Sequence, residues 1–354
     1  GVNKAVAAGG PLQLVPGSRP SLVLIGGAKC GSSDAWVYLM SRFDLEPGRS
    51  GNSKVKEMWC LVKEDHKSMR RCFDDMYSQA PADKFTVDGT PTYIHMYDRH
   101  TQHLGNNEFA PMNMAYAAPD AAAVALLRNP VKRSRSEYGW NMHANGGLFA
   151  PLQARDINQQ LEVELEYLTG GQTKPLMDLL FQEVDAVDAH KVFDAYRKLL
   201  DGYHVWLAKS PEKCRRVSKH DLDSIGQYKI PWCKTWPILI PSFWYPQLLV
   251  WRSVVFKPGR AAVVQSEAYY ARKGILDKLI PLRPKAEVPP AKHNANKQTY
   301  HPGDSTISPQ NMERLNGFFR LPNQRLRELL RVLPAEGVTV LPSVDEPGSW
   351  WQDR

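Results

Sequence analysis

The sequence is poor in cysteine, with five among 354 residues and no pair in a CxxC spacing. Without such a pair, a zinc ribbon or a related structural zinc site is not expected. No apolar run reaches the roughly 20 residues that a membrane-spanning helix needs, so we expect no membrane contact from this chain itself. Internal repeats and long basic tails are also missing, which argues against repeat architectures and against a nucleic acid as the partner.

The odd number of cysteines allows two disulfides at most and leaves at least one thiol over. Cys30 lies inside the glycine-rich loop described below, and we expect it to be that thiol. Cys214 and Cys233 flank a polar loop and could form a bridge, while Cys60 and Cys72 are the remaining two. A chain with all five cysteines reduced is the alternative, and the sequence leaves it open.

The composition that is present fits a folded globular protein, because 43% of the residues are hydrophobic and 23% are charged. The length allows one large α/β domain or two smaller domains. The formal net charge of +8 favours anionic partners such as nucleotides or acidic polysaccharides, without choosing among them.

Short apolar strands alternate with helices along much of the chain. Residues 22–25 form an apolar run that ends in two glycines, as expected of a buried parallel strand that leads into a turn. This alternation predicts an α/β fold with a P-loop-like central parallel sheet flanked by helices. Further strands are predicted at 85–87, 121–127 and 261–265, and helices at 32–42, 64–77, from 131 onward, and at 159–168, 176–200, 272–279 and 310–333.

The predicted organisation is a single domain over residues 21–335. Residues 1–20 are rich in glycine, proline and alanine and are expected to be a linker. Residues 150–235 are polar and largely helical, which indicates an insertion beside the core. Residues 336–354 are expected to be a tail whose two tryptophans pack back on the surface.

The first candidate site is the loop from Gly26 to Ser33, which reads GGAKCGSS and lies between a predicted strand and a predicted helix. Glycines bring backbone N–H groups close to a phosphate, and the helix N-terminus adds its dipole. A nucleotide triphosphatase loop would have lysine directly after Gly31, where Ser32 stands, whereas the lysine here is Lys29 inside the loop. No strand that ends in a carboxylate stands out as a metal partner. We therefore predict a phosphate cradle that needs no Mg²⁺.

The second candidate site is the segment RNPVKRSRSEY, which begins at Arg128 directly after a predicted strand. A planar guanidinium at a strand end can bind a phosphate through two hydrogen bonds. Ser136 lies about two helical turns further on and is expected to face the same phosphate. Arg133 and Arg135 are expected to supply further positive charge.

Taken together, the two segments resemble the phosphate-binding motifs of sulfotransferases that use the donor PAPS (3′-phosphoadenosine 5′-phosphosulfate). The wording KCGSSD looks most like carbohydrate enzymes of the N-acetylgalactosamine 4-sulfate 6-O-sulfotransferase type. Weaker similarity covers Gln265–Glu267, 243–251 and 322–330, so the resemblance extends over about 21–145 and 235–335. The residues that it implies for donor binding are Lys29, Cys30, Gly31, Ser32 and Ser33 at the 5′-phosphosulfate, Arg128 and Ser136 at the 3′-phosphate, and Lys297 in a basic loop that closes over the donor.

The same resemblance implies residues that handle the acceptor. Glu57 matches the family's general base, and Lys56 is its neighbour in the cleft. Trp59 is expected to contact the acceptor as well. It stands where the family usually has histidine, so assistance from a histidine is not implied here. Thr90 and Tyr93 match a loop that borders donor and acceptor, although a plain turn with a packed tyrosine explains them equally well.

The implied chemistry is in-line displacement at sulfur, in which Lys29 would hold the leaving oxygen and PAP, the desulfated nucleotide, would be the product. The expected function is carbohydrate sulfation, with a small-molecule alcohol, phenol or amine as the alternative acceptor. The alternatives from other classes of protein are a P-loop kinase or NTPase and an inactive polyanion-binding module. The resemblance implies the Golgi lumen, with an anchor removed because the chain begins at Gly1, or else the cytoplasm. The oligomeric state is not predicted.

Overall fold

A seven-stranded sheet lies in the first of two compact units into which the chain divides in this computed structural model. The first unit draws on Gly1–Asn129, Gln247–His293 and Leu326–Arg354, and the second on Pro130–Pro246 and Asn294–Arg325. The residues that the structure describes are 10–62, 65–90, 93–94, 110–143, 156–186, 188–209, 237–285 and 306–351.

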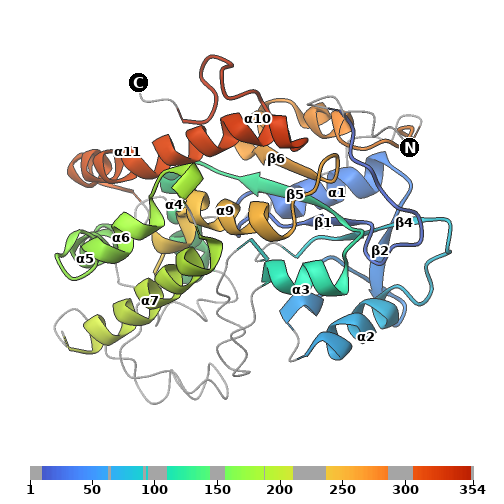
Figure 1. Cartoon of the computed structure of the whole chain (residues 1–354), viewed down its shortest axis with the longest axis horizontal. Coiled ribbons are helices and arrows are strands. Elements are labelled where there is room, and N and C mark those ends of the chain that lie inside the picture. Colours follow the sequence, from blue (N-terminus) through green and yellow to red (C-terminus); the bar gives the residue numbers. More distant parts are fainter. Residues whose placement is uncertain are drawn as a thin grey trace. The chain divides into compact units, whose positions relative to one another are not determined.

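The sheet has the strand order β3-β2-β4-β1-β5-β6-β7. Figure 1 labels β1, β2, β4, β5 and β6 of this sheet. Neighbouring strands are parallel throughout, except for the antiparallel pair β2 and β3 at one edge. Helices flank the sheet, so the predicted α/β fold with a central parallel sheet is confirmed. The strands are β1 (Leu22–Leu24), β2 (Leu45–Ser50), β3 (Ser53–Val55), β4 (Phe85–Asp88), β5 (Ala122–Leu127), β6 (Ala261–Gln265) and β7 (Thr339–Leu341).

The chain reverses its direction of travel across the sheet beside β1. After β1 it moves to β2 on one side, and after β4 it crosses to β5 on the other side. In open α/β sheets, ligands bind outside the carboxyl ends of the strands at such a switch point. The first-unit helices are α1 (Ser32–Arg42), η1 (Cys60–Val62), α2 (His66–Met76), α3 (Ala110–Ala117), α10 (Ser266–Ala271), η8 (Lys273–Lys278) and η10 (Leu333–Glu336).

The second unit is helical among its described residues. Its core includes a buried carboxylate, Glu164, which accepts hydrogen bonds from the N–H groups of Ile238 and Leu239, both at 2.7 Å. Burial raises the pKa of Glu164 to about 7. Its elements are α4 (Pro130–His143), α5 (Ile157–Thr169), α6 (Lys174–Leu180), η5 (Val184–Ala186), α7 (Ala189–Ala208) and η7 (Ile240–Ser242), while α9 (Trp244–Val254) and α11 (Pro309–Val332) contain residues of both units.

Two kinds of element differ from the sequence prediction. The helix predicted over 176–200 is two helices, α6 and α7, because Asp188 caps a new start by accepting the N–H groups of His190 and Lys191. Strand β2 was not predicted because Pro47 and Gly48 interrupt its apolar pattern. Strand β7 lies within the predicted tail and extends the sheet by one parallel strand.

The described part of the predicted linker packs against the rest of the first unit. Leu12 is buried, and its N–H group donates to the Leu279 carbonyl at 2.7 Å. In the tail, Trp350 is buried and its indole donates to the Pro342 carbonyl at 2.8 Å. Both chain segments therefore contribute to the core of this unit. Within the described parts of the chain, no helix combines the length and the apolar character that crossing a bilayer requires.

Candidate active site

The loop from Gly26 to Ser33 joins β1 to α1, as predicted. A Cβ at Gly26 would lie 2.7 Å from that of Leu126, so only glycine allows β1 and β5 to approach here. The Gly27 N–H group then donates to the Leu126 carbonyl at 3.3 Å, and the loop turns at a hydrogen bond from the Cys30 N–H group to the Gly27 carbonyl. These contacts place the loop at the carboxyl end of β1, beside β5.

The same loop carries strained backbone. Lys29 has a φ of 66°, in the left-handed region that side chains other than glycine rarely adopt. Gly31 follows with a φ of 89° and is the N-cap of α1, where it offers no side-chain hydrogen bond to the helix. The first N–H groups of a helix have no partner within it, so α1 presents donors to an outside acceptor. Of the two serines that begin α1, Ser32 is buried and Ser33 is exposed.

Arg128 follows β5 and reaches across to this loop. Its Nη1 atom donates to the Lys29 carbonyl at 2.9 Å, so the two predicted phosphate motifs lie side by side. A third segment joins them, because Ser266 donates to the Cys30 carbonyl at 2.6 Å and Glu267 accepts the Asn129 N–H group at 3.0 Å. The weak sequence similarity around 265–267 therefore marks residues that tie the two motifs together.

The remainder of the second motif lies on α4, in the second unit. Ser136 is partly buried there, and its contact with a phosphate stays a prediction. The expectation for Arg133 is wrong, because its side chain is 1% exposed and is used inside the unit. It donates to the Ile238 carbonyl at 2.9 Å and pairs with Glu137 at 2.5 Å. The spacing of Arg133 and Glu137 by four residues was the signal for this helix-internal pair.

The predicted base belongs to a segment that starts directly after β3. The Nζ atom of Lys56 lies 2.6 Å from an oxygen of Glu57, and the two side chains are 17% and 36% exposed. A Cβ at Gly89 would lie 2.7 Å from the Trp36 ring and 3.0 Å from the Lys56 side chain. Because Trp36 belongs to α1, this packing places the Lys56 side chain beside the helix that begins at the phosphate loop.

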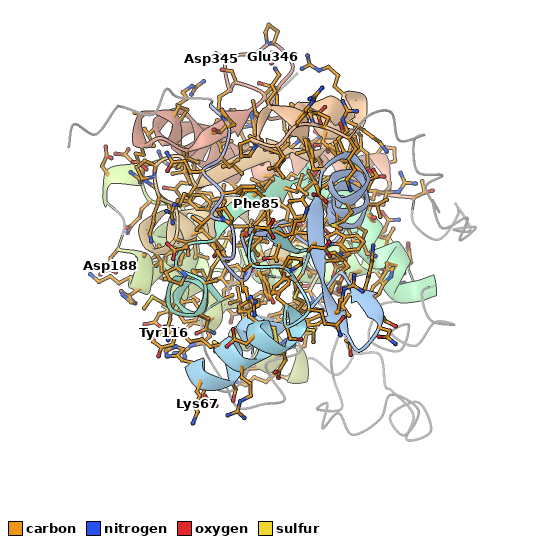
Figure 2. All side chains as sticks on the ribbon, turned by 90° about the vertical axis from the view of Figure 1, so that its right-hand side faces the viewer. Lys67, Phe85, Tyr116, Asp188, Asp345 and Glu346 are labelled. Atoms are coloured by element: carbon orange, nitrogen blue, oxygen red, sulfur yellow. A yellow bond between two sulfur atoms is a disulfide. The ribbon has the colours of Figure 1, made fainter. Side chains whose placement is uncertain are left out.

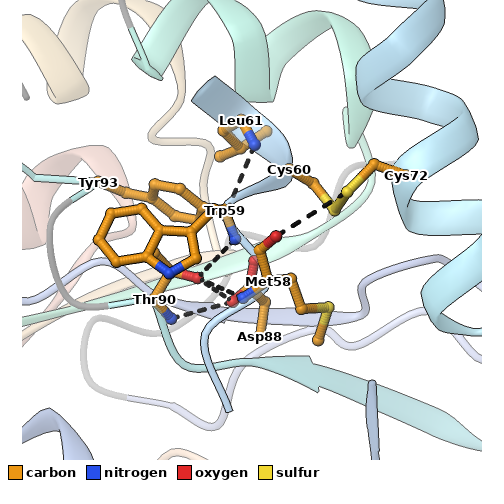
Figure 3. Close-up of a disulfide and its surroundings, with 8 residues drawn as sticks. All are labelled: Met58, Trp59, Cys60, Leu61, Cys72, Asp88, Thr90 and Tyr93. Atoms are coloured by element: carbon orange, nitrogen blue, oxygen red, sulfur yellow. Dashed lines mark hydrogen bonds between the residues drawn. A yellow bond between two sulfur atoms is a disulfide. The ribbon is translucent and has the colours of Figure 1, made fainter. Parts of the chain in front are cut away.

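Buried hydroxyl groups hold the backbone that follows Glu57 (Figure 3). The Thr90 hydroxyl accepts the Met58 N–H group at 3.0 Å and donates to Asp88 at 2.6 Å. The Tyr93 hydroxyl accepts the Leu61 N–H group at 3.3 Å. Neither side chain is more than 1% exposed. Thr90 and Tyr93 were expected to border the acceptor. The structure instead buries both side chains, where they hold the backbone of the segment after Glu57.

Asp88 is a residue that the sequence analysis overlooked. It ends β4 and pairs in register with Val23 of β1, so a strand next to the phosphate loop does end in a carboxylate. The strand predicted at 85–87, directly before Asp88 and Gly89, was the available signal. Asp88 is fully buried, and burial raises its pKa to about 6 although hydrogen bonds from Thr90 act in the opposite direction.

A disulfide between Cys60 and Cys72 anchors the end of this segment to α2 (Figure 3). The sequence analysis did not single out this pair. Cys30 is a buried thiol, as expected. Directly before Cys60, Trp59 has a φ of 56°, so this segment also contains a left-handed residue that is not glycine. Cys214 and Cys233 lie outside the described residues.

Two further expectations concern cations. Lys297, the predicted basic residue over the donor, lies outside the described residues. In the described ranges, no group of three or more His, Cys, Asp or Glu side chains is placed to hold a metal ion.

Comparison with known proteins adds a structural similarity. No protein-family model matches the chain, and no curated protein matches its sequence. A crystal structure of a sulfotransferase from Alicyclobacillus acidocaldarius matches with a TM-score of 0.47 and 16% identity, over 88% of this chain and 96% of that one. At this level of similarity, the match carries no argument about the reaction.

Proposed function

We propose that this protein is a sulfotransferase that uses PAPS as donor and transfers the sulfuryl group to a hydroxyl group of a carbohydrate. The observation that carries the proposal is the direct contact between the two phosphate motifs. Arg128 is hydrogen-bonded to the backbone of Lys29 at the carboxyl ends of β1 and β5, where the chain reverses direction across the sheet.

The loop fits the phosphate groups of such a donor. The close approach at Gly26 and the left-handed turn at Gly31 leave no room for side chains, and α1 presents backbone N–H groups at its start. Arg128 adds a guanidinium at the neighbouring strand end, which suits a second phosphate. The loop has no lysine at the position that a nucleotide triphosphatase uses for its β- and γ-phosphates, which disfavours a kinase.

PAPS, when bound, supplies an activated sulfuryl group on its 5′-phosphate. The acceptor oxygen forms a bond to sulfur while the bond from sulfur to the bridging phosphate oxygen breaks, and that oxygen leaves with the electron pair. The hydroxyl proton passes to the Glu57 carboxylate, whose orientation the Lys56 ammonium fixes at 2.6 Å. Lys29 meets the negative charge that develops on the leaving phosphate. The products are a sulfate ester and PAP, with the released proton on Glu57.

The carbohydrate acceptor rests on the resemblance of the KCGSSD segment to carbohydrate sulfotransferases. One experiment tests donor and acceptor together. Purified protein is given PAPS that carries radioactive sulfur and a panel of glycosaminoglycans and small alcohols, phenols and amines. Transfer to glycosaminoglycans supports the full proposal, and transfer only to small molecules replaces the acceptor class. The proposal fails if PAP does not bind in calorimetry and the protein hydrolyses ATP with Mg²⁺ instead.

A further inference from the structure

The hydroxyl group of Tyr270 lies directly over the start of α1. A Cβ at Gly31 would be only 2.6 Å from the Tyr270 oxygen, so the phenol contacts the backbone where the helix begins. The residue as a whole is nevertheless 48% exposed. Its ring is therefore placed at the surface of the candidate phosphate site, with the polar end directed inward.

The contacts of α10 fix this position. Ser266, the first residue of α10, is hydrogen-bonded to the Cys30 carbonyl at 2.6 Å. Tyr269 donates a hydrogen bond to Asp34 of α1, and Lys273 forms an ion pair with the same carboxylate at 3.2 Å. The rings of Tyr269 and Tyr270 then pack with their centroids 5.4 Å apart. With its neighbours on both sides tied to the loop and to α1, Tyr270 is held in place over Gly31.

The surroundings of the Tyr270 phenol keep it in its protonated form. Burial of the hydroxyl group, followed by the charge of Asp34, raises the pKa of Tyr270 above its usual value, while Arg128 lowers it. The phenol therefore keeps its proton at neutral pH and remains a hydrogen-bond donor. The loop position that the hydroxyl group contacts, Gly31, lies two residues after Lys29, whose carbonyl accepts the hydrogen bond from Arg128.

We propose that Tyr270 is a donor-binding residue whose hydroxyl group donates a hydrogen bond to a phosphate or sulfuryl oxygen held at the start of α1. The exposed ring covers that oxygen from water. This inference rests on the proposed function, since it deepens the donor site. It also explains why residue 31 is glycine for a second reason besides its φ of 89°, because any side chain there would displace the phenol.

The test compares PAP binding of the wild-type protein with Tyr270→Phe and Tyr270→Ala by calorimetry. A lost hydrogen bond to a charged oxygen should raise the Kd about tenfold or more in Tyr270→Phe. Tyr270→Ala should weaken binding at least as much. Tyr116→Phe is the matched control, because Tyr116 is 43% exposed on α3 (Figure 2) and should leave the Kd unchanged. Thermal unfolding of each variant shows whether the fold is retained.

The outcomes separate this inference from the proposed function. Failure of the wild-type protein to bind PAP overturns both. Binding by the wild-type protein with an unchanged Kd in Tyr270→Phe overturns the role of Tyr270 alone. Tighter binding by Tyr270→Ala also overturns it, because the phenol would then obstruct the site. If Gly31→Ala weakens binding and the added Tyr270→Ala change reverses part of that loss, the contact between the two residues is confirmed as the cause.

Discussion

The phosphate loop and the segment 56–61 both carry a left-handed residue that is not glycine, but they are held in opposite ways. Lys29 lies in a loop shaped by glycines and backbone hydrogen bonds. Trp59 lies in a segment supported by the buried hydroxyl groups of Thr90 and Tyr93 and by a disulfide. The first arrangement presents backbone donors to a ligand, whereas the second uses side chains to hold a backbone that carries Glu57. Backbone strain at both places is typical of functional sites.

If Glu57 acts only on the acceptor, its loss should lower the rate of sulfate transfer and leave PAP binding intact, which gives the largest difference between the two regions. Glu57→Gln keeps the shape of the side chain but removes the base, so transfer should fall about 10²- to 10⁴-fold. PAP binding should stay near that of the wild type, because Glu57 lies outside the phosphate loop. Rates of sulfate transfer and calorimetric titrations with PAP measure the two effects, with Glu46→Gln as a control on β2. Near-normal transfer by Glu57→Gln would show that another group is the base.

Loss of Lys29 should slow the step in which the donor releases its sulfuryl group. Lys29→Ala removes the charge that meets the leaving phosphate, so the transfer rate should fall about 10²- to 10³-fold. Lys84→Ala, which removes a surface lysine paired with Asp44, should leave the rate unchanged. Single-turnover rates at saturating donor distinguish a slower chemical step from weaker binding. Equal rates for the two variants would remove Lys29 from the chemistry.

Arg128 should affect the affinity for the nucleotide. Arg128→Ala should weaken PAP binding by about 1.5–3 kcal/mol, the range for hydrogen bonds to charged groups. Arg260→Ala, which breaks a surface ion pair with Asp120 in the same unit, is the control. Calorimetry at one fixed salt concentration is the measurement, because added salt screens such contacts. A Kd equal to that of the wild type would place the 3′-phosphate elsewhere.

The buried carboxyl of Asp88 should make stability depend on pH. Its folded pKa of about 6 lies above the ordinary value of 3.8, so the folded state holds the proton more tightly than the unfolded state. Its contribution to stability is present below pH 3.8 and is lost as the pH rises through 6, by up to about 3 kcal/mol. Asp88→Asn should remove this loss. Glu164 acts in the same direction, so the difference between wild-type and variant urea unfolding at pH 4.5 and 7.5 isolates Asp88. Parallel pH profiles would contradict the assignment.

The sequence predicted the donor region better than the acceptor region, for a physical reason. The phosphate loop is a local pattern, in which one strand, a few glycines and one helix are consecutive, so α1 was predicted with its observed ends. Arg128 was predicted as a phosphate ligand at a strand end, and its contact with that loop was found in the structure. Tyr270 could not be found in this way, because its place over Gly31 depends on contacts between segments more than 230 residues apart. Thr90 belongs to a motif that the sequence shows. Its burial, however, depends on how the chain after β4 packs against the segment after β3.

The hydrogen bond between Asn129 and Glu267 has a consequence for folding. The Asn129 N–H group is bonded to Glu267, a partner 138 residues further along the chain, and most of the second unit is encoded between them. A nascent chain that has finished the phosphate loop and Arg128 therefore still lacks the start of α10, which ties them together. Contacts over such long sequence separations form slowly, because the entropy of closing a long loop must be overcome first. We expect the ability to bind PAP to appear late during refolding, after most of the helical signal has returned.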